Sequence, residues 1–334
     1  MNTTNEIDIF SQSIINDDRT TISKILKNKK IDINQKNKNG ESLLYVAIKN
    51  KKTWAFGLLL MNGAKIKGPV YSDSEKWKTV KECVMHHNNY PMLEIMEKFG
   101  EKINFKGIQE SETLYTAIED HNLDYIKYAL KKGFDASYIN KSNESLLMKM
   151  MSSDMKNSNE TVEDNFWGVV YHLLQFPDQI NCMNEKGQTP ISIFNRYFEK
   201  LNNTNNQKEL KKMVYQLLKN VDISCVYTKS LVSLITLADK LNDETDWMNI
   251  LFKDKNIDEP GVDSETFLMA TVRKSNVNLL EKSICQYNAS LKQVNKDNEN
   301  CKDIAKYLGD VDIFLKIQSI EKERSKRKDK SIGY

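Results

Sequence analysis

Apolar residues in the stretch 39–67 recur at helical spacing. Leu44, Ala47 and Ile48 follow the i, i+3, i+4 pattern of one buried helical face. Ser42 lies just before this run and is a residue type that caps helix N-termini through its side-chain oxygen. The pattern predicts a short helix that begins near residue 43.

A second apolar stripe follows in the same stretch after a polar break. It consists of Ala55, Phe56, Leu59 and Leu60. Gly63 then occupies the place where a helix C-cap needs a left-handed residue. Two short antiparallel helices cannot bury both of their faces alone, so this unit is predicted to stack on copies of itself.

The same pattern returns along the chain. Leu114 and Ala117 match Leu44 and Ala47 at an offset of 70 residues, which fits two units of about 35 residues each. The predicted units are 6–34, 35–67, 68–104, 105–137, 138–181, 182–223, 224–258, 259–291 and 292–320. The first and the last are predicted to be caps, because the outer face of a terminal unit has to tolerate water.

The turn Gly187-Gln188-Thr189-Pro190 has the G-x-T-P form that opens an ankyrin repeat. With this turn and the recurring helix pairs, the chain resembles ankyrin-repeat proteins of a diverged type over nearly its whole length. The resemblance implies an all-α ankyrin-repeat solenoid of about nine helix-turn-helix units with terminal caps, arranged as one array over residues 6–320. The tetrapeptide TPLH never appears whole; its histidine position holds Tyr45, Tyr115, Met148, Ser192 or Met269.

Two polar segments interrupt the units. Residues 152–165 are polar and acidic without apolar periodicity, and we expect either a surface loop between two helices or an extension of the first helix. Residues 201–207 form a second insertion. The first insertion is either a binding element carried on a rigid array or a tolerated insertion. The tail 321–334 is too charged to pack and is expected to be a fraying helix end or disordered.

Charge and composition narrow the classes of partner. The chain carries 49 basic and 46 acidic residues, a net charge of +3, and 40% hydrophobic residues. This near balance, together with the scarcity of arginine among the cations, argues against nucleic acid as a partner. The Lys, Asn and Ile bias is typical of an AT-rich genome and is compatible with a bacterial, phage or viral source.

Cysteine usage and hydropathy bear on location. Five cysteines at wide, irregular spacing favour reduced thiols in a cytosol-like compartment. The sequence shows no secretory signal at its N-terminus and no run of 18 uncharged apolar residues. We expect a cytoplasmic protein with no membrane partner, or one delivered into a host cytosol by a specialised secretion system.

The nearest candidate for chemistry is the cluster Cys83, His86 and His87. A closed zinc site needs four ligands, and no second pair at finger-like spacing lies nearby. No nucleophile elbow, Walker-type loop, dinucleotide turn or H-E-x-x-H motif is present. We therefore expect no metal, no cofactor and no enzyme activity. An enzyme with an unrecognised site at this cluster is kept as an alternative.

The resemblance also implies where a partner would bind. Ankyrin-type arrays use the turn tips and the exposed side of the inner helices, which together form a concave surface. On this sequence the candidate partner-binding residues are Lys38, Tyr45, Val46, Lys49, Tyr115, Thr116, Glu119, Met148, Lys149, Asn184, Lys186, Arg196, Met269, Arg273 and Lys274. For Tyr45 and Tyr115 the alternative is that they fill the core site of the missing histidine.

The first hypothesis for function is a non-catalytic scaffold, monomeric alone, that binds one partner protein through this concave face. A stoichiometric inhibitor, such as an immunity protein that neutralises a toxin, would fit such an array. The second hypothesis is a secreted effector or viral host-range factor that binds a host protein. The enzyme alternative belongs to a different class and is tested by alanine substitution of its cluster.

Overall fold

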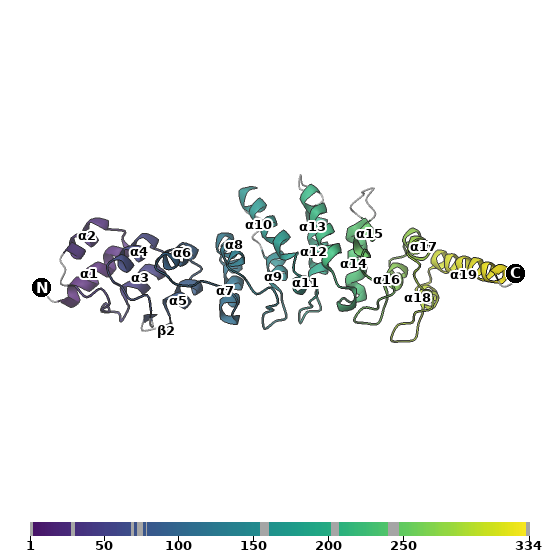
Figure 1. The fold of residues 1–334 in the computed structure, drawn as a ribbon, viewed down its shortest axis with the longest axis horizontal. Coiled ribbons are helices and arrows are strands. Elements are labelled where there is room, and N and C mark those ends of the chain that lie inside the picture. The colour runs from purple at the N-terminus through teal and green to yellow at the C-terminus, as the bar shows by residue number, and fades with distance from the viewer. Residues whose placement is uncertain are drawn as a thin grey trace. The chain divides into compact units, whose positions relative to one another are not determined.

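The structure is a computed structural model made of short helices in pairs, with one small hairpin (Figure 1). It describes residues 3–27, 31–67, 70–71, 76–77, 79–153, 160–201, 207–239 and 247–331. The chain divides into two compact units, Met1–Tyr138 and Ile139–Tyr334. The single array over 6–320 stays a prediction.

The first unit consists of four helix pairs. Its helices are α1 (Thr3–Ile15), α2 (Arg19–Lys27), α3 (Leu43–Lys49), α4 (Thr53–Met61), α5 (Val80–His86), α6 (Tyr90–Lys98), α7 (Ile108–Glu119) and α8 (Leu123–Lys131). The first members of the pairs pack in one row, α1 on α3, α3 on α5 and α5 on α7. The second members form another row, in which α4 packs on α6 and α6 on α8. The predicted stacking of helix pairs is confirmed in this unit.

Local sequence explains the first row. The Ser42 Oγ accepts a hydrogen bond from the Tyr45 backbone N–H at 3.2 Å, as expected of an N-cap. Six of the seven residues of α3 are buried, so this helix packs on more than one side. Gly63 has φ of +90°, the left-handed conformation predicted for it.

A feature that the hydrophobic pattern did not predict lies between α4 and α5. Strands β1 (Val70–Tyr71) and β2 (Lys76–Trp77) pair antiparallel, with Val70 opposite Trp77. Two-residue strands carry too few positions for a period of two to be recognised.

The second unit also stacks in two rows. Its helices are α9 (Leu146–Ser152), α10 (Glu160–Leu173), α11 (Pro177–Ile180), α12 (Pro190–Leu201), α13 (Gln207–Asn220), α14 (Thr228–Asp239), α15 (Trp247–Leu251), α16 (Phe267–Arg273), α17 (Val277–Cys285), α18 (Cys301–Leu308) and α19 (Val311–Ser331), with a 3₁₀ turn at Ile223–Cys225. We call α9, α12, α14, α16 and α18 the inner row, because each packs on the next in that order. The outer row includes α10 against α13, α13 against α15, and α17 against α19.

The first predicted insertion contributes to the outer row. Helix α9 ends at Ser152, so it is not extended, and α10 begins at Glu160, six residues before the apolar stripe that starts at Phe166. The start was missed because residues 160–165 have no apolar periodicity. Residues 154–159, and residues 202–206 of the second insertion, lie outside the described part of the chain.

The C-terminal segment is helical well beyond the core. Ile320 is the last buried apolar residue of α19, yet the helix runs to Ser331. Lys302 Nζ donates to Glu321 Oε2 at 2.7 Å, and Arg324 Nη2 donates to the Ile284 carbonyl at 3.2 Å. These contacts hold the first turn of the predicted tail 321–334 against the array, because its long side chains reach polar groups on α17 and α18. Residues 332–334 lie outside the description.

Candidate binding site

The turns before α12 and α18 of the inner row share one construction. In the turn before α18, the Asn295 Oδ1 accepts hydrogen bonds from the backbone N–H groups of Asp297 and Glu299 at 3.0 and 2.9 Å. The Asn295 Nδ2 donates to Glu299 Oε2 at 3.1 Å. The turn before α12 repeats this arrangement with Asn184 and Gln188. An asparagine followed four residues later by Glu or Gln thus closes each turn.

The turn before α16 departs from this construction at Gly261, where asparagine would stand. A Cβ atom at this position would lie 2.4 Å from the carbonyl oxygen of Val226. The Val262 N–H donates to the same carbonyl at 3.0 Å. The turn therefore lies directly against the segment before α14, and only glycine fits there.

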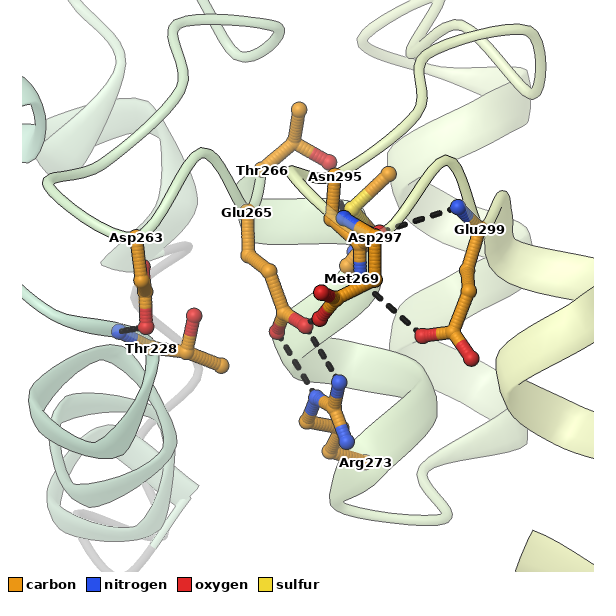
Figure 2. Close-up of polar contacts among 9 residues, drawn as sticks. All are labelled: Thr228, Asp263, Glu265, Thr266, Met269, Arg273, Asn295, Asp297 and Glu299. Carbon is orange, nitrogen blue, oxygen red and sulfur yellow. Dashed lines mark hydrogen bonds and ion pairs between the residues drawn. The ribbon is translucent and has the colours of Figure 1, made fainter. Parts of the chain in front are cut away.

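Asp263 ties the same turn to α14. Its Oδ2 accepts a hydrogen bond from the Thr228 backbone N–H at 2.9 Å, so a residue 35 positions later caps the first turn of α14 (Figure 2). The other carboxylate oxygen, Oδ1, is buried and has no hydrogen-bond partner among the described residues. Asp263 therefore acts in this structure through its Oδ2, as the cap of α14.

Glu265 and Arg273 form an ion pair across one side of α16. Arg273 Nε donates to Glu265 Oε2 at 2.7 Å, and Nη2 donates to Oε1 (Figure 2). Asn295 Nδ2 also donates to Oε1, at 3.2 Å. Burial works to raise the pKa of Glu265, but the hydrogen bonds from Arg273 and Asn295 and the guanidinium charge outweigh it, so the pKa lies below its usual value. Glu265 is therefore ionised and fixes the plane of the arginine fork.

These groups line an open pocket of about 530 Å³. Its lining residues are Thr228, Lys229, Val232, Ser233, Asp263, Glu265, Arg273, Lys296 and Asp297. They come from α14, from α16 and from the turns before α16 and α18, so the pocket lies at the turn end of the inner row. Three cations and three carboxylates line it, which suits a polar or charged ligand group.

The structure distributes the predicted partner-binding residues between surface and core. Exposed are Lys38, Lys49, Thr116, Glu119, Lys186, Arg196 and Lys274, while Lys149 and Arg273 are half-buried. Buried are Tyr45, Val46, Tyr115, Met148, Asn184 and Met269. The buried side chains are not accessible in this structure, and we do not carry them into a binding surface. Of the predicted set, Arg273 alone lines the pocket.

The cluster named for possible chemistry lies on α5. Cys83 is buried within the helix, His86 is its exposed last residue and His87 is the C-cap. The two imidazole rings meet edge to face with centroids 5.5 Å apart. Across the residues that the structure describes, no group of three or more His, Cys, Asp or Glu side chains is arranged to hold a metal ion.

Several lining residues were not singled out from the sequence, chiefly Lys229, Asp263 and Glu265. A sequence signal for Glu265 exists nevertheless. Glu265 and Arg273 are eight residues apart, as are Glu41 and Lys49, which form an ion pair at 3.6 Å in the first unit. An acidic residue followed eight positions later by a cation is thus a sequence signal for an ion pair between the turn and the end of the inner helix that follows it.

Comparisons with known proteins place the chain near ankyrin repeat domains. The chain is similar to the ankyrin repeat domain of Bcl-3, described as a unique member of the IkappaB protein family, with 13% identity over 78% of this chain and 92% of that domain and a TM-score of 0.41. It is also similar to the human ASB11 ankyrin repeat domain, with 14% identity over 88% and 90% of the two chains and a TM-score of 0.29. No family model matches the sequence, and no curated protein sequence matches it.

With TM-scores below 0.5, neither likeness supports a conclusion about partners or activity. The fold is shown by features of the chain itself. Ser or Thr residues cap inner helices, left-handed residues stand in the turns between paired helices, and the helices pack on one another in rows. In the part of the chain that is described, no helix is long and apolar enough to span a bilayer. Apart from the β1–β2 hairpin, each of the two units is a helical stack of ankyrin-type helix pairs.

Proposed function

We propose that this protein is a non-catalytic protein-interaction scaffold, and that its partner protein binds the inner row of the second unit around the Arg273 pocket. The observation that carries the proposal is the guanidinium of Arg273, which two hydrogen bonds to Glu265 hold in place beside the pocket. A charged group held rigidly at a surface loses little conformational entropy on binding and therefore favours recognition. Exposed cations of the predicted set, Arg196 and Lys274, lie on the same row.

The finer role belongs to the same proposal. A stoichiometric inhibitor, such as an immunity protein that holds a toxin inactive, is our first assignment. A secreted effector or viral host-range factor that binds a host protein is the second. In both cases the scaffold acts as a monomer in a cytosolic compartment, without cofactor, nucleic acid or membrane, and the identity of the partner separates the two roles.

Site-specific photocrosslinking tests the proposal. A benzoylphenylalanine at Ser233, in the pocket, should capture one protein in cells of the source organism, whereas the same group at the exposed Lys253 beyond α15 should not. The captured protein is then purified and its affinity measured for the wild type and for Arg196→Glu, Lys274→Glu and Lys253→Glu. We expect the first two variants to lose at least tenfold in affinity and the third to bind as the wild type does. Equal affinity for all four proteins would overturn the assignment of the surface.

A further inference from the structure

We infer that the segment of the partner that enters the Arg273 pocket is an acidic, extended peptide segment, with a Glu or Asp carboxylate on Arg273 and a backbone or side-chain N–H on Asp297. This inference rests on the proposed function and adds the chemistry of the partner. Three observations carry it.

The first observation is the unused edge of the guanidinium. Glu265 accepts hydrogen bonds from Nε and Nη2 of Arg273, while Nη1 makes no hydrogen bond to any described residue (Figure 2). Arginine carries five N–H donors in a fixed fork, so donors remain for a second acceptor. Because Arg273 lines the pocket and is only partly buried, a carboxylate from outside can reach them.

The second observation is an excess of cations along the inner row. Its described side chains include the cations Lys149, Arg196, Lys229, Arg273, Lys302 and Lys306, and Lys274 is the C-cap of α16. Among the described side chains of the same helices, the carboxylates are Asp239 and Asp303, and both accept hydrogen bonds within the unit, from Asn276 and from Asn300. The row therefore presents positive potential to a partner, which favours an acidic one.

The third observation separates an acidic protein from a nucleic acid. Asp297 lines the pocket and its side chain is exposed, so its carboxylate can accept a hydrogen bond from a partner. A phosphodiester backbone offers acceptors only and would give this carboxylate no donor. A peptide offers a carboxylate and N–H donors within a few ångströms of one another. The mixed donor and acceptor character of the pocket therefore fits an acidic peptide.

Defined probes test the inference on the full chain. The binding of fluorescein-labelled, end-blocked twelve-residue peptides of alternating Glu and Ser, Gln and Ser, or Lys and Ser is compared by anisotropy with that of a twelve-nucleotide oligothymidylate. We expect the Glu peptide to bind at least tenfold more tightly than the other three probes at 50 mM salt, and to weaken at 300 mM salt because partly exposed charges are screened. Arg273→Gln should remove most of this preference.

Two further variants keep the test valid if Arg273→Gln loses binding because it does not fold. Lys229→Gln, at the pocket, should weaken binding of the Glu peptide three- to tenfold, whereas Lys253→Gln, beyond α15, should leave it unchanged. Equal affinity for the Glu and Gln peptides, or tighter binding of oligothymidylate, would overturn the inference. If the photocrosslinked partner still binds through the inner row in that case, the proposed function stands and only the acidic character of the segment is wrong.

Discussion

Asp263 caps a helix that begins 35 residues earlier in the chain, because its Oδ2 accepts the backbone N–H of Thr228 at 2.9 Å. Asp263→Ala should remove this cap and lower the free energy of unfolding by about 1 kcal/mol. Urea denaturation followed by circular dichroism measures the change. Asp297→Ala is the matched control, since Asp297 is an exposed carboxylate of the neighbouring turn. Equal stability of the two variants would show that the cap contributes nothing.

The ion pair between Glu265 and Arg273 predicts an asymmetric response to truncation. Arg273→Ala leaves Glu265, which is only 5% exposed, without its main counter-charge. The free energy of unfolding should fall by about 2 kcal/mol, less than for a fully buried pair because Arg273 is partly exposed. Adding Glu265→Gln should recover part of this loss, since the amide removes the unpaired charge. Lys274→Ala, at the adjacent exposed position, should change stability by less than about 0.5 kcal/mol.

The same pair predicts how stability depends on pH. The pKa of Glu265 is lower in the folded chain than its usual value, because hydrogen bonds from Arg273 and Asn295 and the guanidinium charge outweigh the effect of burial. A lowered pKa contributes stability above the unfolded-state pKa of about 4.3, and this contribution is lost as the pH falls through the folded-state pKa. The difference in urea midpoint between pH 7 and pH 3 should therefore be larger for the wild type than for Glu265→Gln. The idea fails if both proteins lose the same amount.

Gly261 predicts a steric effect that has an internal control. Gly261→Ala places a Cβ 2.4 Å from the Val226 carbonyl, so the turn has to move, at a cost of about 1–3 kcal/mol. Gly168→Ala, in α10, meets nothing within 4 Å and should stabilise the helix by up to about 1 kcal/mol. Thermal unfolding of both variants measures the two opposite shifts. A Gly261→Ala protein as stable as the wild type would mean that the turn does not rest on Val226.

The cysteines should differ in reactivity within the second unit. Cys301 is 1% exposed, and burial raises the pKa of its thiol to about 12, so little thiolate forms at pH 8. Cys225 and Cys285 are exposed. An aromatic disulfide reagent should label Cys225 and Cys285 in the native protein and should label Cys301 only after denaturant is added. Mass spectrometry of the wild type and of Cys225→Ser and Cys285→Ser assigns each label, and rapid native labelling of Cys301 would contradict its burial.

The sequence by itself determined the helices and their pairing. The i, i+3, i+4 spacing of residues such as Leu44, Ala47 and Ile48 is a local signal of burial on one helical face, which a stack of helix pairs requires. Ser42 and Gly63 marked helix ends for the same reason, since caps and left-handed turns depend on neighbouring residues alone. For residues beyond Ile320 the sequence left a fraying helix end or disorder open, and the contacts of α19 to Ile284 and Lys302 could not be predicted, because these residues belong to other helices.

Only the tertiary structure decided which predicted surface residues are accessible and where the pocket lies. Tyr45 and Met269 were both placed on the predicted binding surface, with core filling as the alternative for Tyr45, and both are buried. The pocket is lined by Thr228, Glu265 and Lys296, which belong to three consecutive helix pairs of the second unit. No local pattern relates residues more than 30 positions apart, because their contact depends on how adjacent helix pairs stack and not on the properties of either segment alone.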